Sequence, residues 1–218
     1  MKTLIISDTH LGKELNIPKY DYLRTIIEPA DTVIINGDFW DYIYQSFDEF
    51  VLSPWNKLFD LLKERRTVYL YGNHDREEWC DDRVFQFSDS QGDHYVLKSG
   101  GASFYLTHGH IYTLTEIIHN RTNLTLEKIG WYCSDFVEKM GTALLGEDFY
   151  VLVQEINEEI KRKTSLMSKN NDFVICGHTH RAEFDTPHRF INSGVNRYGI
   201  GQYLMIEDGE VSQYSVRY

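Results

Sequence analysis

Cysteine, basic residues and long apolar runs are all scarce in this sequence. The three cysteines, Cys80, Cys133 and Cys176, are odd in number and form no CxxC pair. This pattern argues against a disulfide framework and favours free thiols in a reducing compartment. No run of about 18 apolar residues occurs, so the sequence predicts no transmembrane helix.

The shortage of basic residues makes the chain acidic. It carries 22 Lys and Arg against 33 Asp and Glu, a formal net charge of −11 at pH 7. Such a chain repels nucleic acid overall, and the sequence contains no local basic patch, so we do not expect a nucleic-acid partner. The content of 42% hydrophobic and 25% charged residues is typical of a globular protein.

The length of 218 residues fits one domain that can bury most of its surface. We therefore predict a single domain over residues 1–218, with a helical insert at about 111–171. The N-terminus runs directly into an apolar segment and then Asp8, and cleavage of a signal peptide would remove this carboxylate. We expect a cytoplasmic protein, and the sequence leaves peripheral contact with a membrane open.

Five short apolar segments each end in polar residues of the kind that bind metals. The segments 4–6, 32–35, 68–70, 104–106 and 173–176 have the length and composition of buried strands. A side chain at a strand end is held rigidly and points into the crevice beyond the sheet. The five segments therefore predict one divided metal site. The polar residues that follow them are Asp8 and His10; Asp38 and Asp41; Asn73, His74 and Asp75; His108 and His110; and His178 and His180.

Helical patterns separate the first strands. Apolar residues recur at helical spacing in 20–27, and Ser53 followed by Pro54 is a typical helix start. Strands that alternate with helices predict a layered α/β domain. Further strands are expected at 94–97 and 102–107, which form a hairpin, and at 189–192, 202–206 and 210–216, with a turn at Asp208-Gly209.

Residues 111–171 show almost no strand pattern. Apolar residues recur there at three- and four-residue steps, which predicts two amphipathic helices whose apolar stripe is more typical of core packing than of a lipid site. Because the segment lies between two site-bearing strands, we interpret it as a helical cap that shapes a substrate pocket. The stripe of the first helix comprises Leu126, Ile129, Cys133, Phe136, Met140 and Leu144, and the second pattern runs over 149–160.

The motifs contain seven oxygen and nitrogen donors. They are too many for one four-coordinate zinc ion but suit two neighbouring ions bridged by one carboxylate, for which Asp38 is the natural choice. Four imidazoles and no thiolate favour Mn²⁺, with Fe, Zn²⁺ and Ni²⁺ as alternatives, over Ca²⁺ or Mg²⁺ alone. The seven donors are Asp8, His10, Asp38, Asn73, His108, His178 and His180.

Two such ions suit the hydrolysis of a phosphoester. They would lower the pKa of a shared water, so that hydroxide forms near neutral pH, and would neutralise charge on the phosphoryl oxygens during attack. The leaving oxygen still needs a proton, which His74 can supply. A histidine in this role is usually held by a carboxylate, and Asp41 or Asp75 is available for it.

The same motifs resemble those of the calcineurin-like metallophosphoesterase superfamily. They are Asp8-x-His10, Gly37-Asp38-x-x-Asp41, Gly72-Asn73-His74-Asp75, His108-Gly109-His110 and Gly177-His178-x-His180, in the order of the family. The resemblance implies a two-sheet mixed β sandwich flanked by helices, with His74 as the catalytic histidine and Asp41 as its partner. It also implies one ion held by Asp8, His10, Asp38 and His180, and another held by Asp38, Asn73, His108 and His178.

Within the superfamily, the chain is similar to the UDP-2,3-diacylglucosamine pyrophosphohydrolases in its size, its Ser-Asp-Thr-His-Leu-Gly opening and its helical insert. It departs from their pattern at His74, where they commonly carry arginine, and at His110, where they commonly carry aspartate. We expect His110 and Arg181 to contact the substrate.

The expected activity is hydrolysis of a phosphodiester, a pyrophosphate or a phosphomonoester. The expected partner is a phosphorylated small molecule or a nucleotide-like substrate. Two alternatives stay open. One is a nuclease of the same superfamily, against which the acidic charge counts. The other is a non-catalytic scaffold on this fold, against which the presence of His74 counts.

Overall fold

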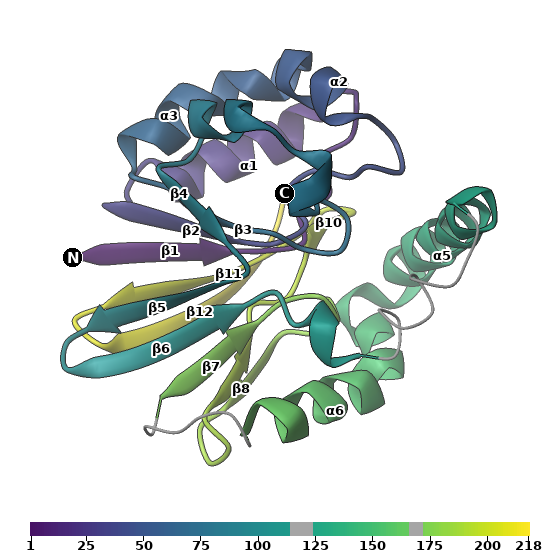
Figure 1. Cartoon of the computed structure of the whole chain (residues 1–218). Helices are drawn as coiled ribbons and strands as arrows, with labels where there is room; N and C mark the ends of the chain where they lie inside the picture. The colour runs from purple at the N-terminus through teal and green to yellow at the C-terminus, as the bar shows by residue number, and fades with distance from the viewer. Residues whose placement is uncertain (114–123, 166–171) are drawn as a thin grey trace.

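Two β-sheets pack against each other with helices on their outer sides (Figure 1). The computed structural model describes residues 1–113, 124–165 and 172–218. This mixed α/β arrangement confirms the fold predicted from the sequence.

The first sheet has a parallel half and an antiparallel half. Its strand order is β10-β11-β1-β2-β3-β4, with β12 paired to β11. Strands β1 to β4 run parallel, and β11 pairs antiparallel with β1. The strands are β1 (Lys2–Ile6), β2 (Thr32–Asn36), β3 (Val68–Leu70), β4 (Ser90–Gly92), β10 (Asn196–Arg197), β11 (Ile200–Glu207) and β12 (Glu210–Arg217).

The second sheet has the order β5-β6-β7-β9-β8. Its three central strands, β6, β7 and β9, are parallel, and the edge strands β5 and β8 are antiparallel to their neighbours. The hairpin expected before residue 108 is β5 with β6. The strands are β5 (His94–Ser99), β6 (Ala102–Thr107), β7 (Phe173–Cys176), β8 (Glu183–Asp185) and β9 (Phe190–Asn192).

Successive residues of the central strands face opposite sides of their sheet. Ile5 and Ile34 of the first sheet pack against Leu106 and Ile175 of the second, between the sheets. Leu4 points the other way, into the layer under the helices. Because both faces of these strands are buried, their sequences are continuous apolar runs rather than alternating patterns.

The helices of the N-terminal half lie over the outer face of the first sheet (Figure 1). Helix α1 begins earlier than expected, because Asn16 accepts a hydrogen bond from the Lys19 amide and caps it. The helix expected after Ser53 begins as the 3-10 turn η1 and continues as α3. The elements are α1 (Ile17–Ile27), α2 (Phe47–Leu52), η1 (Pro54–Leu58), α3 (Phe59–Glu64), η2 (Glu77–Trp79) and η3 (Asp82–Gln86).

Two helices occupy most of the described part of the segment between β6 and β7, as expected. The segment contains η4 (His110–Tyr112), α5 (Leu124–Leu145), η5 (Gly146–Val153) and α6 (Gln154–Ser165). Helix α6 covers the outer face of the second sheet, where Ile160 packs with Val174 and Phe190. The description of this segment as an insert that caps a pocket stays a prediction.

Helix α5 buries polar side chains and exposes apolar ones. Among residues 128–145, whose side chains are described, Glu138 and Thr142 are buried, whereas the stripe residues Phe136 and Leu144 are 64% and 78% exposed. Ile129, Cys133 and Met140 are exposed as well, so the expected core packing of this stripe is wrong for these residues. The reason is that the inward face of α5 meets charged groups, described below. The side chain of Leu126 lies outside the described part.

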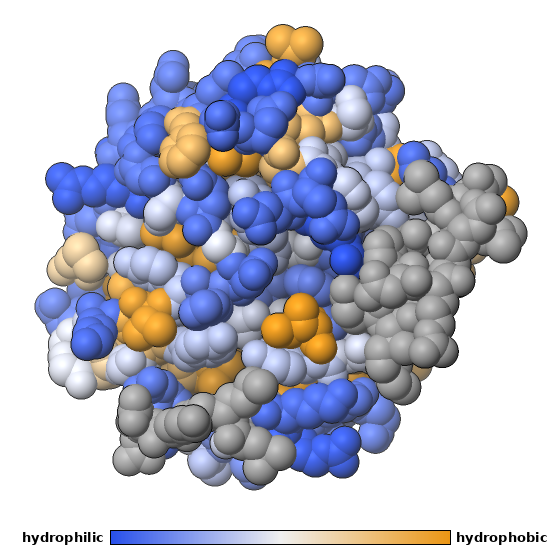
Figure 2. Space-filling model, in the orientation of Figure 1, coloured by the Kyte–Doolittle hydropathy of each residue, from blue (hydrophilic) through white to orange (hydrophobic). Residues whose placement is uncertain are grey.

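The surface is mainly hydrophilic on the face shown in Figure 2, where hydrophobic side chains form small separate groups. Within the described ranges, none of the helices combines the length and the apolar character needed to cross a membrane. The three cysteines are free, and Cys176 is buried in β7.

Helix α2 provides a test of local stability. Ser46 and Glu49 form a capping box, in which each side chain accepts a hydrogen bond from the backbone of the other. Replacing Ser46→Ala should lower the free energy of unfolding by about 1 kcal/mol, because the Glu49 amide loses its acceptor. Urea unfolding followed by circular dichroism measures this change. Ser90→Ala, at an exposed site in β4, is the control, and an equal loss in both variants would contradict the role of the cap.

Candidate metal centre

The site lies where the parallel strands of both sheets end. The loops after β1, β2 and β3 and those after β6 and β7 meet there. Asn36, at the end of β2, donates hydrogen bonds from its side chain to the carbonyls of Thr107 and Ile175, at 3.2 and 3.4 Å. The Gly177 amide donates to the carbonyl of His108 at 3.0 Å. The Asn36 contacts fix the ends of the two sheets against each other, and the Gly177 contact joins the loops after β6 and β7 within the second sheet.

Strained backbone is concentrated in these loops. Five of the nine described non-glycine residues with positive φ belong to the predicted ligand set. Left-handed backbone costs an L-residue about 1–2 kcal/mol, and such strain clusters at functional sites. The five are Asp8 (φ 53°), His10 (44°), Asp38 (53°), His178 (68°) and His180 (61°).

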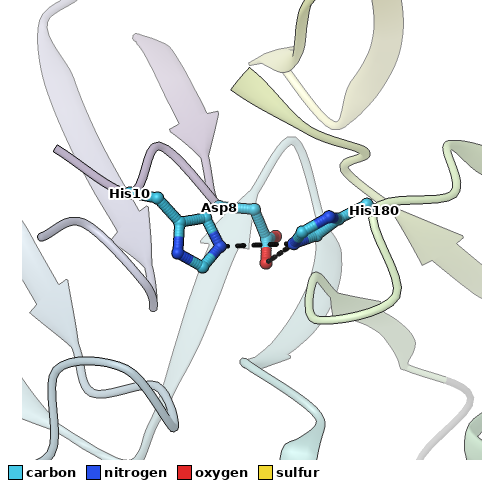
Figure 3. A group of neighbouring side chains, drawn as sticks. All are labelled: Asp8, His10 and His180. Carbon is cyan, nitrogen blue, oxygen red and sulfur yellow. Dashed lines mark hydrogen bonds and ion pairs between the residues drawn. The ribbon is translucent and has the colours of Figure 1, made fainter. Parts of the chain in front are cut away.

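The first group of donors comprises Asp8, His10 and His180, which point toward one another (Figure 3). His180 Nε2 is 3.3 Å from Asp8 Oδ1 and 3.2 Å from His10 Nε2. Two ring nitrogens that face each other beside a carboxylate form a donor set suited to a divalent cation. The side chains are buried or nearly so, and they come from opposite ends of the chain.

The second group lies beside the first, and Asp38 lies near histidines of both. Asp38 Oδ2 is 3.2 Å from His108 Nε2 and 3.6 Å from His10 Nε2. Asn73 Oδ1 is 3.2 Å from His108 Nε2 and 2.8 Å from His178 Nδ1. All seven predicted donors therefore lie in one cluster, with Asp38 between its two halves. Their role as ligands stays a prediction.

A backbone carbonyl on the side away from the carboxylates orients the His108 ring. His108 Nδ1 lies 2.8 Å from the carbonyl of Asn36, to which it can donate, and this leaves Nε2 facing the carboxylates. Burial opposes the charged form of His108, but Asp38 and Asp8 outweigh it and raise its pKa to about 9. A cation bound here would displace such a proton, because a ligating imidazole must be neutral.

Asp41 holds two histidines at once. Its Oδ1 is 3.1 Å from His74 Nδ1, and its Oδ2 is 3.1 Å from His10 Nδ1. Burial would raise the pKa of Asp41, but His74 and His10 outweigh it and keep the pKa below its ordinary range. Burial likewise opposes the charged form of His74, but Asp41 and Asp38 raise its pKa above the ordinary value. These two carboxylates thus favour the protonated form of His74, which lies beside the donor cluster.

Asp75, the other carboxylate considered as a partner of His74, accepts hydrogen bonds from the backbone instead. Its oxygens accept hydrogen bonds from the amides of Asp38, Phe39 and Gly72 at 3.0, 2.6 and 2.7 Å. Asp75 therefore joins the loop after β2 to the loop after β3. Of the two candidates, Asp41 is the one that contacts His74.

Three motif glycines leave room for donors that belong to other loops. A Cβ atom on any of them would come within 3.0 Å of a donor side chain, and real side chains do not approach so closely. All three glycines are thus a packing requirement, and Gly37, with φ of 86°, meets a turn requirement as well. The three contacts are Gly37 against His108, Gly72 against Asp38, and Gly177 against Asp8.

Comparison with known families agrees with this geometry. The model of the calcineurin-like phosphoesterase superfamily domain matches residues 1–213. The chain belongs to the calcineurin-like phosphoesterase superfamily. No curated protein matches it.

Several solved structures are similar to the chain. An archaeal phosphodiesterase is similar over 99% of this chain and 100% of its own, with 20% identity and a TM-score of 0.53. The phosphoesterase Yfce of E. coli covers 100% of both chains, with 16% identity and a TM-score of 0.47. Vps29 of Entamoeba histolytica, solved with zinc, is 17% identical over 100% of this chain and 99% of its own, with a TM-score of 0.47.

The two residues expected to contact substrate lie at the edge of the donor cluster. The His110 ring lies next to those of His108 and His178, with centroids 5.5 and 6.2 Å away. Arg181 lines a second cavity, together with His180 and Glu147. Neither residue lines the cavity directly in front of the donors. Their contact with substrate stays a prediction.

Glu138 of α5 belongs to the site but carries no sequence motif. Its Oε1 is 2.6 Å from His180 Nδ1 and accepts a hydrogen bond from the Tyr150 hydroxyl at 2.8 Å, while Oε2 accepts from Arg197 at 3.1 Å. Burial opposes the charged form of His180, but Glu138 and Asp8 raise its pKa to about 10. In the sequence, Glu138 belongs to a polar stripe at helical spacing. Such a stripe is typical of an ordinary solvated face, so it does not identify Glu138 as part of a site.

The close approach of Gly37 to His108 predicts a loss of metal binding in Gly37→Ala. The new methyl group would displace the imidazole, and we expect Mn²⁺ affinity to fall at least tenfold in isothermal titration calorimetry. Gly101→Ala is a matched control, because Gly101 also has positive φ (81° against 86°) but has no atom within 4 Å of the Cβ position. Equal affinity in the two variants would contradict the packing argument.

The contact of Glu138 with His180 predicts a second effect on metal binding. Replacing Glu138→Gln keeps the size of the side chain but removes the charge that holds the imidazole, so Mn²⁺ affinity should fall about 10–100-fold. Glu155→Gln, at an exposed carboxylate of α6, should leave the affinity unchanged. Calorimetry and metal content after dialysis measure both. Unchanged affinity in Glu138→Gln would show that α5 does not support the metal centre.

Proposed function

We propose that this superfamily member is a dinuclear metal-dependent phosphoesterase that hydrolyses a phosphodiester, a pyrophosphate or a phosphomonoester. One observation carries the proposal. Seven oxygen and nitrogen donors from five separate loops converge, and a histidine held by a carboxylate lies beside them. A structural role alone would not require so many buried titratable groups in strained backbone.

Two divalent cations fit the donors. Asp8, His10, Asp38 and His180 would hold one, and Asp38, Asn73, His108 and His178 the other, with Asp38 shared. Mn²⁺ is our first choice among Mn²⁺, Fe, Zn²⁺ and Ni²⁺. When bound, such a pair activates water for attack and neutralises charge on the phosphoryl group.

His74 is the group of this chain that moves a proton. Asp41 accepts a hydrogen bond from Nδ1 of His74, so Nε2 of His74 is the nitrogen left for substrate. His74 also lines the cavity in front of the donors. Because Asp41 and Asp38 outweigh burial and raise the pKa of His74, the imidazolium is available to protonate the leaving oxygen. Asp41 also holds His10, so one carboxylate positions both the proton donor and a candidate ligand.

A phosphorylated small molecule suits this site better than a nucleic acid does. The chain has a net charge of −11, and the described residues that line the cavity include four carboxylates, those of Asp38, Asp41, Asp135 and Glu138. A long polyanion gains little from such a surface. The nuclease alternative therefore has less support. The scaffold alternative does not account for His74 and its contact with Asp41.

The proposal is tested by hydrolysis of bis-p-nitrophenyl phosphate and p-nitrophenyl phosphate. Protein loaded with Mn²⁺, Ni²⁺ or Zn²⁺ should release p-nitrophenol, and EDTA should abolish the release. Replacing His74→Ala should lower kcat by about 10²–10⁴-fold with unchanged metal content, because the proton donor is lost and the donor cluster is not.

His94→Ala is the control for the loss of a histidine, because His94 lies in β5 at an exposed position. It should keep both its metal and its activity. Inactivity of the wild-type protein with every metal would reject the proposal. Full activity of His74→Ala would reject the assignment of the proton donor.

A further inference from the structure

A cavity of about 460 Å³ opens directly in front of the donor cluster. Its size is within the range of small-molecule sites. One wall includes five of the donors and His74, and another is formed by residues of α5, η5 and α6. The two walls differ in chemistry, and this difference bears on what the cavity can hold.

The wall formed by the helical segment is largely apolar. Val137 of α5, Phe149 and Val153 of η5 and Ile156 of α6 line it, and Val137 and Ile156 are 58% and 36% exposed. These side chains are accessible to a ligand and leave apolar surface in contact with water. A ligand that covered this surface would gain the free energy of its burial.

The apolar wall reaches the proposed proton donor. The Trp131 ring of α5 lies edge-on to the His74 ring, with centroids 4.5 Å apart. A phosphoryl group at the donors would therefore place a substituent within reach of Trp131 and the wall beyond it. Continuity between the two walls means that one molecule can occupy both.

Cationic groups for a second phosphate are absent from the described lining. Arg197 is the single lysine or arginine among the described residues that line the cavity, and it is 9% exposed. Its guanidinium pairs with Asp135 and Glu138. A second phosphate away from the donors would meet carboxylates and apolar side chains, without a cation to offset its charge.

We infer that the cavity takes an ester with a single phosphoryl group and an apolar substituent, which packs on Val137, Phe149, Val153 and Ile156. The inference rests on the proposed phosphoesterase function and narrows its substrate class. Hydrolysis adds the oxygen of water to phosphorus and breaks one ester bond, and the departing oxygen takes up a proton. The products are an alcohol and a phosphate group with one ester fewer.

A series of esters with one leaving group tests the inference. The substrates are methyl, butyl and hexyl p-nitrophenyl phosphate, together with the p-nitrophenyl ester of thymidine 5′-phosphate, which carries a polar substituent on its single phosphate. We expect kcat/KM to rise about two- to fourfold per added methylene, as burial of alkyl surface predicts. The hexyl ester should exceed the thymidine ester.

Variants of the apolar wall test whether the dependence on alkyl length comes from these side chains. Val137→Ser and Ile156→Ser should lower the dependence of log kcat/KM on alkyl length to less than half of its wild-type value. Leu144→Ser and Leu152→Ser are matched controls, because these residues are 78% and 75% exposed in the same segment but do not line the cavity. They should leave the dependence unchanged.

The outcomes separate this inference from the proposed function. Hydrolysis that does not depend on alkyl length, or that is fastest with the thymidine ester, overturns the inference and leaves the phosphoesterase proposal in place. Hydrolysis of p-nitrophenyl phosphate but of none of these diesters also overturns the inference alone, whereas hydrolysis of neither removes both. An equal loss of length dependence in all four variants also overturns the inference, because the effect would then not come from the cavity wall.

Discussion

The site depends on the hydrogen bonds that join Asn36, at the end of β2 in the first sheet, to the second sheet. The Asn36 side chain joins the end of β2 to the carbonyls at the ends of β6 and β7, and its own carbonyl lies within hydrogen-bond distance of the His108 ring. Parallel strands bring their carboxyl ends to one edge of a sheet, but they do not align one sheet with another. A buried amide with several partners provides that alignment, so donors from distant parts of the chain meet within hydrogen-bond distance.

The sequence predicted most of the fold and most of the site because both are encoded locally. An apolar run followed by Asp8 or His178 identifies a strand and its functional end without knowledge of the rest of the chain. The elements that it missed include α2, β4, β8 and β10, which are two to six residues long, too short for a periodic pattern to develop. The residues alone left the partner of His74 open between Asp41 and Asp75, and only the resemblance pointed to Asp41, because the tertiary structure decides which carboxylate reaches the ring.

Helix α5 shows why amphipathic patterns do not fix orientation. Its apolar stripe predicted a helix correctly and a buried face incorrectly. The stripe indicates that two faces of the helix differ in polarity, but it does not indicate which face packs against the rest of the protein. Here the polar face meets Arg197 and His180, so Glu138 is buried and paired, while Phe136 faces water. A charged residue in such a helix has the same sequence signature whether it is solvated or holds a candidate ligand.

The close contacts of the motif glycines bear on how such a site can change during evolution. Each glycine accommodates a side chain from a different loop, so the loops are interdependent in shape. A larger residue in one loop would be tolerated only after the opposing donor had been shortened or moved. Substitutions in this centre are therefore expected to be inherited in concert, and the loops of one lineage should not be interchangeable singly with those of another.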